Sequence, residues 1–208
     1  MIRTLSALAL SALIGYLLGC SNMALYLSRL KGVDLRSGGS GNLGASNALV
    51  MMGWWAGILT AVHDIGKAVL AVVLVRHLFE GLPLVGAVAG VACVLGHMYP
   101  FYLHFRGGKG FASYLGMTLA LNWKLALVIL LAVALITLIS DYIVLGTVTT
   151  VIAVPAYLGC TQSWILAAIL CIGSGVILWK HRENFVRLAK GEEIGLRGAH
   201  RGDHRAKT

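Results

Sequence analysis

The sequence predicts an all-α integral membrane protein with seven transmembrane helices. Of its 208 residues, 58% are hydrophobic and 12% are charged, and the mean hydropathy is +0.83. Soluble domains average about 45–50% apolar and about 25% charged residues. The apolar residues form seven runs, and about 20 apolar residues suffice to cross a bilayer as a helix. We therefore expect a membrane domain over residues 1–194 and a flexible basic tail over 195–208.

The first expected span, residues 4–28, follows Arg3 and resembles a signal peptide, but no clear Ala-x-Ala cleavage site follows it. We expect this helix to be retained, because six further apolar runs follow. Those six spans are expected at residues 49–76, 82–102, 110–122, 124–140, 142–159 and 163–180. The fourth is short for a complete crossing and is a candidate half-span lining a polar cavity.

The basic residues predict the orientation of these spans. With the N-terminus outside, 13 Lys and Arg residues fall in the cytoplasmic loops and tail, and three (Arg3, Arg76 and Lys124) fall outside. This asymmetry follows the positive-inside rule and predicts a cytoplasmic C-terminus. Topology thus accounts for the net charge of +9, and without an Arg-rich face or an aromatic-interleaved basic stripe we expect no nucleic-acid binding.

The four cysteines lie in or beside apolar runs, without the spacing of a zinc site or a CxxC motif. They are Cys20, Cys93, Cys160 and Cys171. We expect all four to be buried as small hydrophobic residues.

Three polar clusters interrupt the apolar runs. They cover residues 39–47 (Gly-Ser-Gly-Asn-Leu-Gly-Ala-Ser-Asn), 105–110 (Phe-Arg-Gly-Gly-Lys-Gly) and 181–193. Glycine lets backbone amides turn toward a bound anion, and Lys or Arg supplies the countercharge. The expected topology places all three clusters on the cytoplasmic side, which predicts one shared site for a phosphorylated substrate.

Each cluster also has a simpler interpretation. The first could be a solvated loop, the second an ordinary helix connector, and the third an amphipathic juxtamembrane helix. The second cluster is not a P-loop, because Leu103 and Gly110 occupy positions that this motif reserves for Gly and for Ser or Thr. It does precede an apolar run that begins at Phe111, so its amides would lie at a helix N-terminus, which favours anions.

Several ionisable residues fall inside or at the end of expected spans. Asp64 and Lys67 share one helix face, and the pair could be structural or catalytic. His97 precedes Pro100, which would break the third span, and it could carry a proton or bind a carbonyl group. His63 has no partner evident in the sequence and is expected to pack.

Together, these elements resemble the bacterial acyl-phosphate:glycerol-3-phosphate acyltransferases, the PlsY family. Residues 34–47 resemble the first motif of that family, and Asp64 and Lys67 resemble the Asp-x-x-Lys of its second helix. Residues 96–110 resemble its second motif, and residues 181–193 resemble its third. Each motif alone is weak, but the ordered set is specific.

The resemblance implies a seven-helix enzyme of the bacterial plasma (inner) membrane whose active site faces the cytoplasm. Such an enzyme transfers a fatty acyl group from acyl phosphate to the sn-1 hydroxyl of glycerol 3-phosphate, giving lysophosphatidate and phosphate for phospholipid biosynthesis. Acyl phosphate is already activated, so we expect no covalent nucleophile, cofactor or metal ion. Catalysis would depend on positioning two anions and on donors aimed at the developing oxyanion. The expected partners are both substrates and membrane lipid, and the expected state is a monomer.

The resemblance also assigns roles to residues of this sequence. The catalytic candidates are Ser40, His97, Lys109 and Asn184. The substrate-binding candidates are Arg36, Gly41, Asn42, Asn47, Lys67, Arg106, Gly107, Gly108, His181, Arg187 and Glu193. One phosphate is assigned to Ser40, Gly41, Asn42 and the amides of Gly107 and Gly108, and the other to Lys109, His181, Asn184 and Arg187. The acyl chain is expected to lie between helices.

Two positions depart from the family pattern. Val50 stands where the family usually has Arg, and Val144 stands where it usually has Ser. A hydrogen bond to a charged group contributes about 1.5–3 kcal/mol, so losing these donors could weaken phosphate binding roughly 10- to 100-fold. Arg36 or Arg106 could compensate; otherwise the chain is an altered-acceptor or non-catalytic paralogue that binds a phosphorylated ligand.

A small channel or transporter is the remaining alternative. It would need a polar stripe through several helices, and only Asp64 and Lys67 supply one. No internal repeat supports an inverted-repeat transporter.

Overall fold

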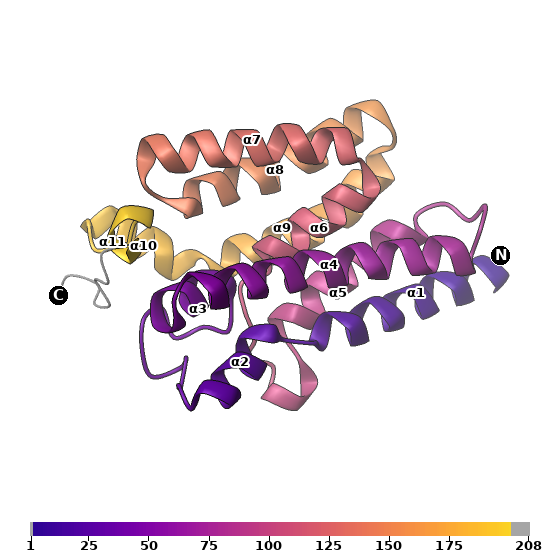
Figure 1. Cartoon of the computed structure of the whole chain (residues 1–208). Coiled ribbons are helices and arrows are strands. Elements are labelled where there is room, and N and C mark those ends of the chain that lie inside the picture. Colours follow the sequence, from indigo (N-terminus) through magenta and orange to yellow (C-terminus); the bar gives the residue numbers. More distant parts are fainter. Residues whose placement is uncertain (1, 201–208) are drawn as a thin grey trace.

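The computed structural model describes residues 2–200, and within that range it is helical and contains no strand. The helices are α1 (Ile2–Cys20), α2 (Met23–Lys31), α3 (Ala45–Met52), α4 (Trp54–Leu78), α5 (Val85–Met98), the 3₁₀ turn η1 (Phe101–Leu103), α6 (Phe111–Leu121), α7 (Trp123–Ser140), α8 (Ile143–Thr161), α9 (Trp164–Lys180), α10 (Arg182–Lys190) and α11 (Leu196–His200). All seven apolar runs are helical, which confirms the all-α prediction. The long helices extend along one direction, with the start of α1 at one end and α3, α10 and α11 at the other (Figure 1).

Five helical segments in the described part of the chain are long and apolar enough to cross a membrane. They are Ile2–Lys31, Trp54–Leu78, Val85–Leu103, Trp123–Ser140 and Ile143–Thr161. The bent pair formed by α9 and α10, with 45° between them, would be a sixth span. The apolar α6 is shorter, with 11 residues, so the count of seven stays a prediction.

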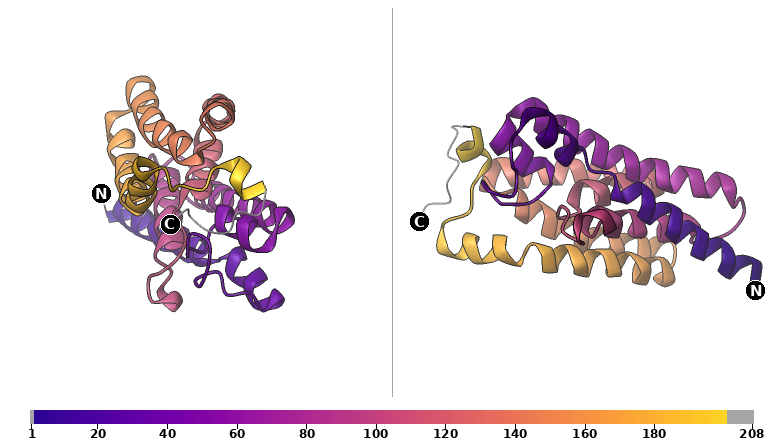
Figure 2. Two further views of the ribbon diagram at one scale, coloured as in Figure 1. Left: turned by 90° about the vertical axis from the view of Figure 1, so that its left-hand side faces the viewer. Right: turned by 90° about the horizontal axis from the view of Figure 1, so that it is seen from below.

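Two of the expected spans are interrupted. The first breaks at Ser21 and Asn22, because Asn22 caps α2 by accepting a hydrogen bond from the Leu25 amide at 2.9 Å. The expected helix over 49–76 breaks at Gly53, whose φ of 91° is accessible mainly to glycine. Figure 2 shows the same bundle from the end that carries α10 and α11 and from below.

Small residues bring α1 and α5 into backbone contact. Gly15 and Gly19 are one helical turn apart, and a Cβ added at either would lie 2.1 Å from a carbonyl oxygen, that of Ala89 or Cys93. Small residues spaced by four allow such close approach between membrane helices. This contact fixes α5, and with it His97, beside the break in the first span.

The cysteine prediction is half wrong. Cys20 and Cys93 are buried between helices, but Cys160 and Cys171 are exposed on α8 and α9. An apolar run in a membrane protein can face lipid as readily as protein, so apolar surroundings in the sequence did not settle burial.

The expected basic tail begins with described structure. Gly195 and Leu196 continue from α10 across the α7–α8 turn, where the Leu196 amide donates to the Asp141 carbonyl at 2.8 Å. The Arg197 amide donates to the Asp141 carboxylate at 2.9 Å. Residues 201–208 of the expected tail lie outside the described part of the chain.

Candidate active site

The three polar clusters meet in one cavity of about 280 Å³ at the end of the bundle that carries α3 and α10. Its polar lining includes Gly39, Ser40, Asn42, Ser46, Asn47, Asp64, His97, Lys109, His181, Asn184, Arg187 and Glu193. These residues come from five separate parts of the chain. The geometry therefore matches the prediction that the clusters share one site.

Asn47 holds the first cluster in shape through hydrogen bonds to backbone groups. Its side-chain amide donates to the carbonyl oxygens of Leu35 at 2.7 Å and Asn42 at 2.9 Å, and its oxygen accepts from the Ser40 amide at 2.8 Å. A Cβ at Gly39 would lie 2.2 Å from that oxygen, and Gly39 has a φ of 58°. Asn47 is 1% exposed, so its hydrogen bonds shape the loop that presents Ser40 and Asn42 to the cavity.

Two helix N-termini point to the cavity. Helices α3 and α6 are preceded by Gly44 and Gly110, neither of which caps its helix with a side chain. The cavity is lined by the first residues of α3, including Ala45, and by Phe111 and Ala112 of α6. Unpaired amides and the helix dipole favour an anion at such ends. The short α6 thus contributes its N-terminus to a polar cavity, as expected, and its being a half-span stays a prediction.

The amides of Gly107 and Gly108 have a different role from the one expected. They donate to the carbonyl oxygens of Met98 at 3.0 Å and His97 at 3.2 Å, and neither glycine lines the cavity. A Cβ on Gly108 would lie 2.1 Å from His97 Nε2. The two glycines therefore hold their loop against the end of α5 and leave room for the imidazole. The Gly41 amide is likewise used, since it donates to the Gly38 carbonyl at 3.0 Å.

A connected polar network forms the cationic side of the cavity. Lys109 Nζ donates to Asn184 Oδ1, and Asn184 Nδ2 donates to Glu193 Oε1. Arg187 Nε donates to Glu193 Oε2 at 2.7 Å. Burial, aided by the charge of Arg187, lowers the pKa of Lys109 to about 8, although Glu193 and Glu183 act in the opposite direction. A bound phosphate would supply the countercharge that this ammonium group lacks.

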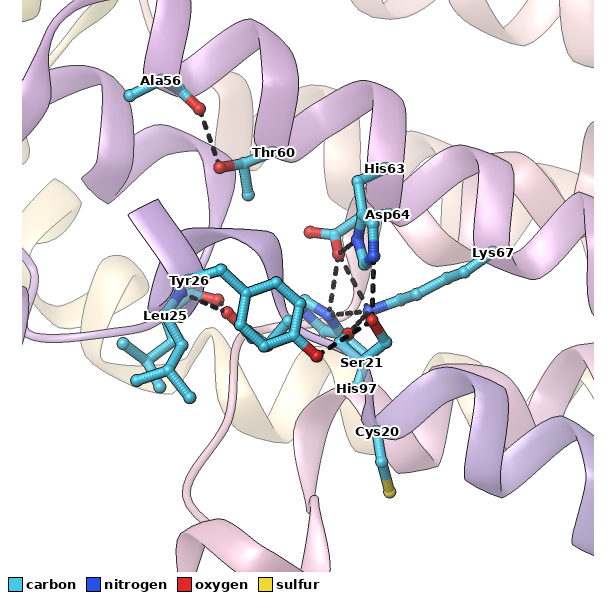
Figure 3. Close-up of polar contacts among 12 residues, drawn as sticks. Cys20, Ser21, Leu25, Tyr26, Ala56, Thr60, His63, Asp64, Lys67 and His97 are labelled. Carbon is cyan, nitrogen blue, oxygen red and sulfur yellow. Dashed lines mark hydrogen bonds and ion pairs between the residues drawn. The ribbon is translucent and has the colours of Figure 1, made fainter. Parts of the chain in front are cut away.

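Lys67 is buried next to two residues that line the cavity. Its ammonium group lies 2.8 Å from Asp64 Oδ1, 2.9 Å from His97 Nδ1 and 2.7 Å from the Ser21 carbonyl oxygen (Figure 3). Asp64 and His97 line the cavity, whereas Lys67 does not. Substrate contact by Lys67 has no support in this geometry. Asp64 was not among the expected site residues, and its i,i+3 spacing from Lys67 was the available signal.

His63 is better connected than the sequence suggested. Its Nε2 lies 2.9 Å from Ser21 Oγ, and its Nδ1 lies 3.4 Å from Asp64 Oδ1. The first contact joins residues 42 apart in the chain, which no local pattern could indicate.

Arg36 and Arg106, the candidates to compensate for Val50 and Val144, do not line the cavity. Arg36 is exposed and donates to the Arg106 carbonyl at 3.1 Å. Val50 and Val144 both do, on α3 and α8. Ile194 and Leu196 also line it and were missed, because nothing in the sequence showed that the segment after α10 returns across the cavity.

The fold and the cavity define a helical integral membrane protein with a site for an anionic substrate at one end of its bundle. The chain belongs to the glycerol-3-phosphate acyltransferase family, which it matches over residues 9–191. It is 34% identical over 187 residues to the glycerol-3-phosphate acyltransferase of Prochlorococcus marinus (strain MIT 9312), a match covering 86% of this chain and 93% of the relative. It is 39% identical over 184 residues to the one from Caulobacter vibrioides (strain NA1000 / CB15N), covering 86% and 83%.

Solved structures agree with this assignment. The chain is similar to PlsY, an integral membrane glycerol 3-phosphate acyltransferase, in the crystal structure of its glycerol 3-phosphate form, with a TM-score of 0.85 and 33% identity. That match covers 91% of this chain and 95% of the other. The lysophosphatidic acid form gives a TM-score of 0.81 at 32% identity. The chain is therefore a multi-pass membrane protein of this fold.

Proposed function

We propose that this protein transfers a fatty acyl group from acyl phosphate to the sn-1 hydroxyl of glycerol 3-phosphate, forming lysophosphatidate and phosphate for phospholipid synthesis. The observation that carries the proposal is the convergence of all three clusters on one cavity that holds Lys109, Arg187 and two helix N-termini. Family membership and the solved structures of similar sequence support the same reaction.

The reaction needs positioning more than covalent help from the protein. The acceptor hydroxyl oxygen bonds to the acyl carbon, the bond from that carbon to the phosphate oxygen breaks, and the hydroxyl proton ends on the released phosphate. Lys109, Asn184 and Arg187 are placed to bind one phosphate, and Ser40 and the start of α3 to bind the other. Holding both reactants in one geometry replaces a bimolecular encounter with an effectively intramolecular step.

The chemical test uses the purified protein in lipid with palmitoyl phosphate and labelled glycerol 3-phosphate. Labelled lysophosphatidate and an equal amount of released phosphate are the expected products. Absence of both products, with the protein shown to be folded, would contradict the proposal. Lys109→Ala is the matched control, because it removes a cavity cation while leaving the rest of the pocket in place.

The topology that accompanies this function has seven spans in the bacterial inner membrane, an outside N-terminus and a cavity facing the cytoplasm, in a monomer. Charge asymmetry supports it, and the cavity lies at the opposite end of the bundle from the start of α1. Two variants without the native cysteines test this topology. One carries Ser37→Cys and the other carries Glu80→Cys. With a membrane-impermeant maleimide, intact cells should label position 80 alone, and permeabilised cells should label both; the reverse pattern would invert the topology.

Altered acceptor use is the second candidate, and one observation favours it. Val50 and Val144 line the cavity where the family resemblance calls for a guanidinium and a hydroxyl. An acceptor with less negative charge would lose less from their absence than glycerol 3-phosphate. Phosphate release that depends on an added alcohol other than glycerol 3-phosphate would identify this activity in the same assay.

A further inference from the structure

One side of the cavity is formed by the short segment that joins α10 to α11. Residues 194–197 of this segment, which we call the strap, run from α10 toward α3, against which α11 packs (Figure 2). Three of them, Ile194, Gly195 and Leu196, line the cavity. Because the strap lies outside the long helices, its position depends on the few contacts that anchor it.

Asp141, in the turn between α7 and α8, anchors the strap. Its carbonyl oxygen accepts a hydrogen bond from the Leu196 amide at 2.8 Å, and its carboxylate accepts one from the Arg197 amide at 2.9 Å. The Arg197 guanidinium also donates to the Leu138 carbonyl of α7 at 3.1 Å. The carboxylate contact joins residues 56 apart in the chain, so it fixes the strap to a distant part of the bundle.

Both residues at this contact are fitted to it. Gly195 is buried, and a Cβ there would lie 1.9 Å from Asp141 Oδ2, so only glycine lets the strap lie directly on the carboxylate. Asp141 has a φ of 73° where it ends α7, a left-handed conformation that Asp and Asn tolerate and Gly adopts freely. The side chain of Asp141 can therefore be removed by substitution with Gly without straining the backbone.

The anchored strap connects the cationic network to an apolar part of the cavity wall. Glu193, directly before the strap, belongs to the network with Asn184 and Arg187. The strap side chains that line the cavity, those of Ile194 and Leu196, are apolar. A strap fixed at Asp141 thus holds Glu193 in its network and covers part of the cavity with side chains that do not bind water.

Water is the competitor that such a wall has to exclude. In the proposed reaction the acyl carbon is attacked by the hydroxyl of the acceptor. Attack by water breaks the same bond between the acyl carbon and the phosphate oxygen, and gives a fatty acid and phosphate without an ester. Closing an active site against water prevents side reactions of this kind.

We propose that Asp141 is a positioning residue that fastens the strap over the cavity, so that the acyl group passes to the acceptor hydroxyl and not to water. Asp141 does not line the cavity and acts through the amides of Leu196 and Arg197. This role in the reaction rests on the proposed acyl transfer, whereas the anchoring of the strap does not.

Hydrogen exchange tests the anchoring without turnover, on the purified protein in lipid nanodiscs. Asp141→Gly is the informative variant, because it keeps the backbone conformation and the carbonyl oxygen and removes only the carboxylate. Loss of one charged hydrogen bond shifts a local opening equilibrium about 10- to 100-fold, and exchange in peptides covering residues 194–198 should speed up by that factor. Asp141→Asn keeps an acceptor oxygen and should exchange more slowly than Asp141→Gly. Unchanged exchange in Asp141→Gly, or equal exchange in the two variants, would overturn the anchoring.

The ratio of products tests the role in the reaction. With palmitoyl phosphate and glycerol 3-phosphate, the wild type should release equal amounts of phosphate and lysophosphatidate. Asp141→Gly should release more phosphate than lysophosphatidate, with free palmitate accounting for the difference, and Asp141→Asn should largely restore equality. A variant that is only less stable loses both products together, so equal amounts from Asp141→Gly would overturn the role. A wild type that forms no lysophosphatidate while the exchange result holds would contradict the proposed function and leave the anchoring confirmed.

Gly195→Ala tests the same contact from the strap. Its methyl group would meet the Asp141 carboxylate, so this variant should also release phosphate in excess of lysophosphatidate. Once Asp141→Gly has removed the carboxylate, adding Gly195→Ala should have little further effect, and fully additive effects would overturn the direct contact. Gly198→Ala is the matched control, because a Cβ there lies at an ordinary contact distance of 3.7 Å from Ile194 Cγ2. Its products should stay equal, and an excess of phosphate like that of Gly195→Ala would contradict the proposal.

Discussion

Lys67 and Lys109 belong to two regions of one site that differ in how their charges are satisfied. Lys67 is enclosed between helices, where Asp64, His97 and the Ser21 carbonyl use all its donors. Lys109 lies on a loop, donates to Asn184, and has its pKa lowered to about 8 by burial and by the charge of Arg187. A cation with all its partners inside the protein is part of the scaffold, whereas one short of countercharge is available to a ligand.

The same contrast extends to the surrounding elements. The Asp64–Lys67–His97 group lies on α4 and α5, and α5 is held against α1 by glycine contacts. The Lys109–Asn184–Arg187–Glu193 group lies on the loop before α6 and on the segment from α10 to α11. Binding residues on connecting segments, supported by a rigid scaffold, are a common arrangement. Measuring both the stability and the activity of the same variants therefore distinguishes the scaffold from the ligand-binding region.

The largest effect is expected from Lys67→Met. The substitution leaves the Asp64 carboxylate, 1% exposed, without its ammonium partner. Breaking a buried ion pair costs about 3–5 kcal/mol, so the melting temperature in lipid should fall sharply and the yield of folded protein with it. Lys109→Met should melt close to the wild type. Equal melting temperatures for the two variants would contradict the structural role of Lys67.

Lys109→Ala should instead lower activity. It removes a cation that bonds Asn184 in the cavity, and loss of a charged hydrogen bond of about 1.5–3 kcal/mol corresponds to roughly a 10- to 100-fold fall in kcat/KM. Asn184→Ala should act in the same direction. The assay is lysophosphatidate formation, alongside a melting curve. If neither variant reduces transfer, the shared phosphate site is wrong.

Val50→Arg should strengthen the ligand-binding region. Val50 lines the cavity, so a guanidinium there adds a charged donor, and the apparent affinity for glycerol 3-phosphate should improve about 10-fold or more. Val50→Met is the size control and should leave the affinity unchanged. An unchanged KM in the Arg variant would show that the departure from the family pattern is not a simple loss of a phosphate contact.

The pH dependence of binding should report Lys109. In the empty protein its pKa is lowered to about 8, so the ammonium form is present below this pH and is lost as the pH rises through it. Between pH 7 and pH 9 the charged fraction falls about tenfold, and phosphate affinity should fall with it. Lys109→Arg keeps its charge throughout and should flatten the profile. A wild-type profile that stays flat over this range would contradict the role of Lys109 as the titrating cation.

The smallest effect is expected outside the cavity. Arg36 is exposed and bonds a backbone carbonyl of the adjacent loop, away from the cavity lining. Replacing an exposed arginine of this kind changes stability by about 0.5 kcal/mol or less. Because Arg36 does not line the cavity, a loss of transition-state binding of similar size is expected, and Arg36→Ala should alter kcat/KM less than about threefold. A fall comparable to that of Lys109→Ala would restore the compensating role inferred from the sequence.

Much of the site was accessible from the sequence because the residues form short, ordered motifs. Ser40, His97, Lys109 and Asn184 were identified on that basis, and all four line the cavity. Gly107 and Gly108 were given free amides, but those amides are paired with carbonyl groups at the end of α5. Whether an amide is available depends on the backbone folded beside it, which a motif does not specify.

The sequence by itself determined the membrane class, the seven apolar helical runs, the three clusters and the family, because hydropathy and motif order are properties of contiguous residues. Only the tertiary structure decided which charges face a ligand. The family resemblance assigned both Lys67 and Lys109 to the site. Only Lys109 lines the cavity, because Lys67 meets Ser21, 46 residues away, and His97, 30 residues away. Hydrogen bonds between distant segments depend on how helices pack, and the break at Ser21 and the close α1–α5 contact established that packing here.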